Sequence, residues 1–203
     1  MEKIQLKNMD RQIFQDAVEK TLEKNIYFHS LALEACMGGI YDYLKENNQL
    51  ENEAPKEDWL LAGLIHDIDY VGEFKEFHPN KTKEALQRSG LEISDSVDQI
   101  VKAHAPELTK IKPISKAQWS IFCADSLTGL IVATALIYPD KKLSIVKISS
   151  VLKRFLKEPR FAAGTRRDEV AQCQLPNSLN IPLEKFIEIC LTSMQQIAPQ
   201  IGL

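Results

Sequence analysis

The histidines are the residues whose positions most directly suggest chemistry in this chain. They are His29, His66, His78 and His104. His29 follows Ile26 by three residues, and His104 follows Ile100 by four, so both imidazoles are expected on buried helix faces. A neutral imidazole is a common metal ligand, although a single inward histidine is also often a hydrogen-bonded core residue. Several histidines facing one interior favour the metal interpretation.

Two aspartates share these apolar surroundings. Asp67 directly follows His66 at the end of the apolar run WLLAGLI, and Asp125 follows Ile121 by four residues. An ionised carboxylate on an apolar helix face is costly unless a positive charge compensates it. A cation supplies that charge, and inward histidines supply neutral nitrogen ligands. The combination predicts a mixed site for divalent Fe, Mn, Mg or Zn.

The number of ions, one or two, depends on the remaining histidines. The smallest complete ligand set comprises His29, His66, Asp67 and Asp125. It would leave His78, which precedes Pro79 at a loop-to-helix entry, and the inward His104 without a ligand role. Adjacent residues on a helix point about 100° apart, so Asp67 can flank one ion or bridge two. We expect two ions, with His78 and His104 as ligands of the second, although an exposed loop histidine would also be unremarkable.

The order of these residues resembles the HD-domain superfamily of metal-dependent phosphohydrolases. The phrase LAGLIHDIDY has the family's apolar helix running directly into the His-Asp pair. His78-Pro79 and His104 are similar to the extra histidines of its two-metal branches, among them cyclic-dinucleotide phosphodiesterases and a dinucleoside tetraphosphate hydrolase. The segments CADSLTGLIVATALIYPDKKL and FAAGTRRDEV resemble a bacterial group of predicted HD hydrolases. The resemblance covers roughly residues 25–197.

This resemblance implies hydrolysis of a small phosphate ester or anhydride, with a nucleotide as the expected substrate, by metal-activated water. Asp69 is a candidate catalytic residue that orients the attacking water, with a supporting carboxylate as the alternative. The sequence Ile68-Asp69-Tyr70 stands where the phosphodiesterase branch carries Gly-Lys after its His-Asp pair, and no GYP signature follows. These departures argue against cyclic di-GMP as the substrate and leave the general acid unassigned.

Two adjacent arginines are the candidates for substrate binding. Arg166 and Arg167 follow Gly164 near an expected helix start. Guanidinium groups bind phosphate as a fork, and helix N-termini favour anions. The lysine-rich segment 141–157 is more typical of a solvated helix face, and the same interpretation is open for the arginines.

The elements that must position these residues are predicted to be helices. Apolar residues recur at three- and four-residue spacing, and no strand-like alternation lasts long enough for a sheet. Helices are expected near 10–23, 27–46, 57–68, 80–89, 94–104, 115–138, 142–157, 166–173 and 182–197. A length of 203 residues without a linker or repeat fits one domain. We therefore expect an all-α, single compact HD-type bundle over 1–203, with its core at about 25–197.

Composition narrows the expected partners. The chain is 44% hydrophobic and 26% charged, with a net charge of −3, which gives no electrostatic reason to expect nucleic-acid or membrane binding. The N-terminus is too polar for a signal peptide, and the nearly uncharged run 126–139 is too short to span a bilayer. Four cysteines without a CxxC pair indicate small core residues in a reducing cytoplasm. The expected partner is a small phosphorylated substrate, and a homodimer is left open.

Two other functions fit the same residues. A regulatory HD module that binds metal or nucleotide without turnover is one, and a two-metal HD oxygenase is the other. A missing ligand would have favoured the regulatory module. Because the ligand set is complete in the sequence, hydrolysis is the preferred prediction.

Overall fold

A computed structural model describes residues 2–203. Every regular element in this range is helical. The side chains are described from residue 11 onward. The α-helices are α1 (Glu2–Thr21), α2 (Lys24–Glu46), α3 (Lys56–Ile65), α4 (Thr82–Gln87), α5 (Asp95–Lys102), α6 (Pro106–Thr109), α7 (Lys116–Leu136), α8 (Ile148–Lys157), α9 (Arg167–Ala171) and α10 (Leu183–Gln196). The 3-10 helices are η1 (Gly72–Phe77), η2 (Leu143–Ile145), η3 (Gln172–Gln174) and η4 (Ala198–Ile201). The all-α prediction is confirmed.

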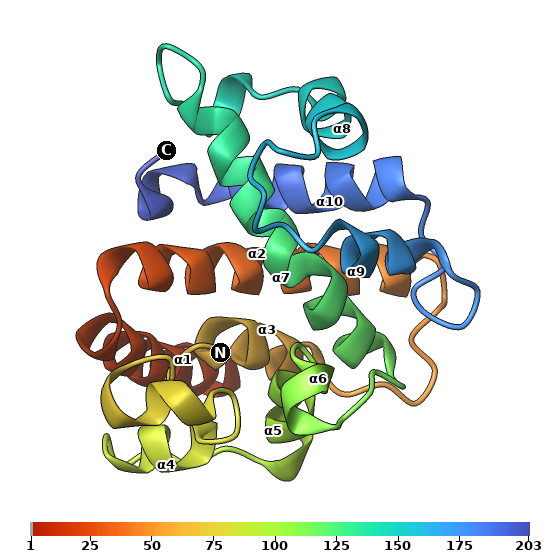
Figure 1. Cartoon of the computed structure of the whole chain (residues 1–203). Helices are drawn as coiled ribbons and strands as arrows, with labels where there is room; N and C mark the ends of the chain where they lie inside the picture. Colours follow the sequence, from red (N-terminus) through yellow and green to blue (C-terminus); the bar gives the residue numbers. More distant parts are fainter. Residues whose placement is uncertain (1) are drawn as a thin grey trace.

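Helix α2 is the central element of the fold. It lies between α10 and α3, and α7 crosses α10 and α2 on one side (Figure 1). A helix surrounded in this way must be apolar on several faces, and α2 buries residues at most of its turns, including Leu33, Met37 and Ile40. His29 lies in the first half of α2, so the central packing of this helix positions its imidazole.

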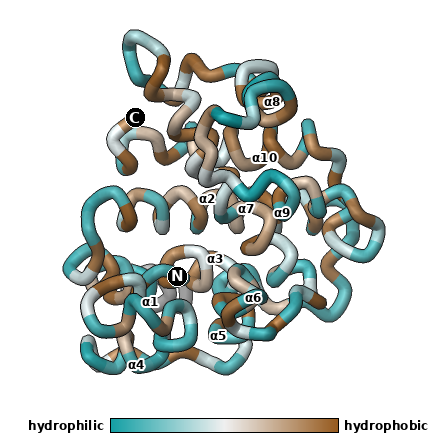
Figure 2. The backbone as a smooth tube through the Cα atoms, in the orientation of Figure 1, coloured by the Kyte–Doolittle hydropathy of each residue, from teal (hydrophilic) through white to brown (hydrophobic). Residues whose placement is uncertain are grey.

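Helix α7 is the long apolar helix that carries Asp125. Its first turn is closed by a capping box, in which Ser115 accepts from the Gln118 N–H and the Gln118 side chain accepts from the Ser115 N–H. By length and composition α7 could cross a membrane, but 67% of its most apolar window is buried inside the protein. It is mostly apolar where it crosses the other helices (Figure 2). Its apolar character is therefore that of a core helix.

The hydrophobic core extends beyond the expected limits of about 25–197 at both ends. Val18 of α1 and Leu22, which directly follows α1, belong to it, as do Ala198 and Ile201 of η4. Helix α1 packs on α3 and α2, and the Arg11 guanidinium binds both carboxylate oxygens of the buried Glu34, at 2.5 and 2.6 Å. The four cysteines are free and buried, as expected for small core residues.

Several expected helices have different limits in the structure, among them the first, which was expected over 10–23 and is α1 (Glu2–Thr21). The helix expected over 57–68 ends at Ile65, so the His-Asp pair lies in a turn just after α3. The helix expected over 142–157 divides into η2 and α8, with Val146 in an extended conformation between them. The reason is tertiary, because Gln195 Nε2 of α10 donates to the carbonyls of Leu143 and Val146 at 3.0 and 3.2 Å.

The stretch 106–113, which lies between the helices expected over 94–104 and 115–138, contains the short helix α6. Pro106 occupies its first turn, where the missing N–H of proline costs nothing. Thr109 Oγ1 donates to the carbonyl of Lys102 at 2.9 Å, which joins α6 to the end of α5. This short helix begins two residues after His104, so its hydrogen bond to α5 connects the segments on either side of that histidine.

Candidate metal centre

All six residues predicted as metal ligands converge in one place. They come from α2, the turn after α3, the residue after η1, the end of α5 and α7. The first group comprises His29, His66 and Asp125, and the second group comprises Asp67, His78 and His104. Within each group the possible ligand atoms lie within 4.8 Å of one another. These buried groups can therefore hold a metal ion.

The main chain orients the two most deeply buried imidazoles. His66 Nδ1 lies 2.9 Å from the Gly63 carbonyl, and His104 Nδ1 lies 2.6 Å from the Val101 carbonyl. A carbonyl oxygen only accepts hydrogen bonds, so each Nδ1 carries the proton. In the neutral ring, each Nε2 therefore keeps a free lone pair that points into the centre.

The other two histidines have the same orientation, with different partners. His29 Nδ1 lies 2.8 Å from Thr128 Oγ1, whose hydroxyl donates to the Asp125 carbonyl at 2.8 Å. That hydroxyl therefore accepts from His29 Nδ1–H. His78 Nδ1 lies 2.6 Å from Asp69 Oδ1. With Nδ1 as the donor, the neutral form of each of the four imidazoles presents Nε2 as the acceptor, which is the form that binds a metal.

The Nε2 atoms then meet in pairs that only a cation or a proton can satisfy. The distance from His66 Nε2 to His29 Nε2 is 3.1 Å, and that from His78 Nε2 to His104 Nε2 is also 3.1 Å. Two unprotonated nitrogens at this separation turn their lone pairs toward each other, which is unfavourable in a buried site. A bound cation converts each pair from a repulsive contact into a set of ligands.

Asp67 lies between the two groups. Its Oδ2 is 3.3 Å from His66 Nε2, and its Oδ1 is 3.4 Å from His78 Nε2. One carboxylate therefore faces both histidine pairs with different oxygens. This is the arrangement that a carboxylate needs to bridge two ions.

The electrostatics of the centre match the same assignment. Burial lowers the pKa of His104 to about 4, so this imidazole is neutral at neutral pH. Burial alone would raise the pKa of Asp67 and of Asp125, but the neighbouring histidines hold both pKa values well below their ordinary range. Burial, the largest single influence, opposes protonation of His29, but the hydrogen bond to Asp125 and the negative charges of Asp125 and Asp67 together outweigh it and raise the pKa of His29. A proton and a metal ion therefore compete for the same nitrogen.

Arg166 lies at the edge of the centre. Its Nη2 donates to Asp125 Oδ2 at 2.6 Å, while Asp125 Oδ1 lies 3.0 Å from His29 Nε2. Its Nε donates to Glu169 at 2.5 Å, and its side chain remains 38% exposed. The guanidinium therefore reaches the cluster and solvent at once, as a phosphate-binding group must.

Arg167, which we expected to share substrate binding, points elsewhere. Its Nε donates to the Phe155 carbonyl at 3.1 Å, and its Nη2 donates to the Phe161 carbonyl at 2.6 Å. Its Nη1 faces the Ala162 carbonyl at 3.5 Å. A guanidinium used in this way organises the chain between α8 and α9, so the geometry gives no support to a substrate-binding role for Arg167.

Asp69, expected to orient the attacking water, is fully buried with both oxygens occupied. Oδ1 accepts from His78, and Oδ2 accepts from the Lys81 N–H at 2.8 Å. Because the side chain is buried and already hydrogen-bonded to His78 and to the Lys81 backbone, the geometry supports the alternative of a supporting carboxylate. Thr128 also orients a ligand, and sequence reasoning did not identify this role. It follows Asp125 by three residues, and its hydroxyl accepts a hydrogen bond from His29 Nδ1.

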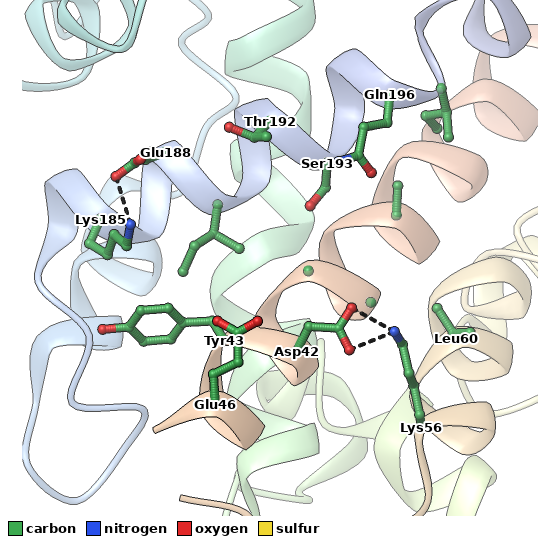
Figure 3. Close-up of a pocket in the computed structure, with 15 residues that line it drawn as sticks. Asp42, Tyr43, Glu46, Lys56, Leu60, Lys185, Glu188, Thr192, Ser193 and Gln196 are labelled. Carbon is green, nitrogen blue, oxygen red and sulfur yellow. Dashed lines mark hydrogen bonds and ion pairs between the residues drawn. The ribbon is translucent and has the colours of Figure 1, made fainter. Parts of the chain in front are cut away.

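A separate groove of about 490 Å³ lies between α2, α3 and α10 and includes none of the six cluster residues. Two ion pairs line it, Asp42 of α2 with Lys56 of α3, and Lys185 with Glu188 within α10 (Figure 3), and Glu46 lines it as well. These pairs leave the groove without converging groups of the kind that the histidine cluster provides.

Known proteins offer no direct guide to the cluster. Comparison of the chain with protein-family models, with curated proteins and with solved structures finds no match. The chemistry of the centre is therefore inferred from the atoms that the fold brings together.

Proposed function

We propose that this protein is a metal-dependent phosphohydrolase of the HD type, which acts on a small phosphate ester or anhydride. A nucleotide is the substrate class that we favour, and the free buried cysteines fit a cytoplasmic location. The observation that carries the proposal is the pair of Nε2–Nε2 distances of 3.1 Å, with Asp67 between the pairs. This arrangement suits two divalent ions, and two-metal sites commonly serve phosphoryl hydrolysis.

The residues around the centre would have different roles in the proposed hydrolysis. When bound, divalent ions would supply a hydroxide nucleophile from water and offset charge on the phosphoryl oxygens. The two histidine pairs and Asp125 would hold the ions, and Asp67 would fix their separation. Arg166, which contacts Asp125 and solvent, is positioned to bind a non-bridging phosphate oxygen beside the ions.

The test of this function combines metal analysis with a substrate panel. Protein purified without chelators should contain a transition metal by elemental analysis. It should hydrolyse at least one of a panel of nucleotides and phosphomonoesters in the presence of Mn, Fe, Mg or Zn. Nucleotide binding seen by thermal shift, without turnover under any of these metals, would replace the proposal with a regulatory module. Oxygen consumption without phosphate release would indicate an oxygenase instead.

Replacement of Arg166 by alanine should weaken substrate binding without loss of metal. A charge-assisted hydrogen bond contributes about 1.5–3 kcal/mol, and partial exposure places Arg166 near the lower end, so KM should rise about tenfold. Metal content should equal that of the wild type. Arg166→Lys keeps the charge but not the fork and should give an intermediate KM.

A suitable control for this prediction is Lys153→Ala. The Lys153 side chain is 64% exposed on α8, where its ammonium pairs with Glu158 at 3.4 Å. This variant should leave both KM and metal content unchanged. If Arg166→Ala also leaves KM and kcat unchanged, Arg166 belongs to the solvated surface and has no role in the substrate site.

Gly129 marks the open side of the centre and gives a further prediction. It is an exposed glycine inside α7, one turn after Asp125, and a Cβ added there would meet no atom within 4 Å. Helical side chains lean toward the N-terminus of their helix, so a side chain at 129 would extend toward Asp125. Gly129→Ala should stabilise the fold by about 0.5–1 kcal/mol with KM unchanged. Gly129→Leu should raise KM several-fold by obstructing the substrate, and unchanged kinetics in this variant would place the substrate elsewhere.

A further inference from the structure

We infer that Asp69 is a positioning residue, which fixes the tautomer and the orientation of His78 so that His78 Nε2 faces the second metal group. The inference deepens the proposed function and rests on its metal centre. It differs from the water-orienting role expected from the sequence, because it acts through His78 and not on the substrate.

The first support is the position of His78 itself. His29 lies within α2, and His66 and His104 follow the last turns of α3 and α5 directly. His78 instead follows the 3-10 helix η1 with an extended ψ of 137°. Its ring meets the edge of Tyr70, with centroids 5.2 Å apart, and this contact sets no proton position. The hydrogen bond to Asp69 is the interaction that decides which nitrogen carries the proton.

The second support is that Asp69 is held in place from its other side. Its Oδ2 accepts from the Lys81 backbone N–H at 2.8 Å, while its Oδ1 lies 2.6 Å from His78 Nδ1. The carboxylate thus links the turn after α3 to the start of α4 and receives two donors with two oxygens. It is 0% exposed, so water does not compete for either oxygen.

The third support is the direction in which the other ring nitrogen points. With Nδ1 donating to Asp69, His78 Nε2 is an acceptor that lies 3.1 Å from His104 Nε2 and 3.4 Å from Asp67 Oδ1. A carboxylate behind a ligand histidine both fixes this tautomer and makes the ligand nitrogen more basic. Asp69 therefore prepares the second group for a cation before the cation arrives.

Asparagine at position 69 tests this inference because it keeps the shape and removes one acceptor. The amide has one oxygen, whereas His78 Nδ1–H and the Lys81 N–H are two donors. If the amide oxygen accepts from Lys81, the amide NH₂ faces His78 Nδ1. His78 must then move its proton to Nε2, which directs an N–H into the metal group and blocks the ligand nitrogen.

The experiment measures the tautomer and Zn²⁺ binding in the full chain. In metal-free wild-type protein, ¹⁵N NMR of the imidazoles should show His78 protonated on Nδ1, and in Asp69→Asn on Nε2. Zn²⁺ titration should show about 10–100-fold weaker binding at the second group only, the usual effect of losing an outer hydrogen-bond partner. The matched control is Asp98→Asn, which alters another buried carboxylate, 5% exposed and paired with Lys102 at 2.8 Å, and should change neither measurement.

Two results would overturn the inference. One is a wild-type His78 protonated on Nε2, a measurement that does not depend on any variant folding. The other is an Asp69→Asn protein that binds Zn²⁺ at both groups with wild-type affinity. Failure of the phosphohydrolase proposal is a separate result, because it would appear as an inactive wild type in the substrate panel with the tautomers as inferred.

Discussion

Replacing Asp67 by alanine should abolish tight metal binding and hydrolysis together. Among the side chains that the structure describes, Asp67 is the carboxylate that faces both histidine pairs, at 3.3 Å from His66 Nε2 and 3.4 Å from His78 Nε2. If Asp67 bridges two ions as proposed, its removal takes an oxygen ligand from both of them. The loss in affinity should therefore exceed the approximately 10–100-fold that an outer partner costs. His66→Ala should have a similar effect, since it removes a fully buried ligand.

Metal content and thermal stability check this prediction together. A metal present at about 100 times its Kd adds about 2.7 kcal/mol to the stability of the folded state, which for a chain of this size raises Tm by about 5–10 °C. The wild type should show this increase, and Asp67→Ala should not. The metal-free variant should still fold, because most of its stability comes from the helical core.

The control for Asp67→Ala is Asp42→Ala. The Asp42 side chain is 54% exposed and pairs with Lys56 at the surface, so this change removes an aspartate without altering the centre. It should retain wild-type metal content and the wild-type rise in Tm. Wild-type metal content in both Asp67→Ala and His66→Ala would contradict the assignment of these residues as ligands.

The second large effect concerns the number of ions. We expect about two metal ions per chain, because Asp67 turns one oxygen toward each histidine pair. His78→Ala or His104→Ala should reduce this to about one, because each removes a nitrogen from the second group. His29→Ala or Asp125→Ala should first affect the ion of the other group. Elemental analysis with Zn²⁺ titration measures both the number of ions and the order of loss.

His78→Ala is the more informative of the two second-group variants. His104 is only 3% exposed, and its replacement leaves a cavity in addition to a missing ligand. The side chain of His78 is 12% exposed and lies beyond the ends of the long helices, so its loss disturbs packing less. One bound ion in the wild type, unaffected by either change, would exclude the two-ion site and favour the smaller set of four ligands.

Local pattern was sufficient to predict the fold class and which side chains face inward. Helical spacing placed His29, His104 and Asp125 on apolar faces, and the structure buries Asp125 and His104 beside His66. The apolar run before His66 likewise predicted a helix that delivers the His-Asp pair to the interior. These inferences succeed because the period of a helix determines which residues share its buried face.

Contacts between distant segments determine the side-chain partners and the helix limits that helical spacing does not predict. Arg166 and Arg167 are adjacent and chemically identical, yet one reaches Asp125 and the other donates to the carbonyls of 155–162. The break before α8 depends on Gln195, about fifty residues away in the sequence, whose amide satisfies the carbonyls of Leu143 and Val146. No local pattern encodes which partner satisfies such a group.

Within the candidate site, too, some features follow from local helical spacing and others from contacts between distant segments. The pattern of apolar residues around them predicted that imidazoles and carboxylates share an interior, since burying them singly would be costly. That Asp69 faces His78, and that each imidazole presents Nε2 to the centre, follows from contacts between segments of the folded chain. The position of a proton on a ring depends on which acceptor lies opposite Nδ1, and the folded chain sets that arrangement through atoms such as the carbonyls of Gly63 and Val101.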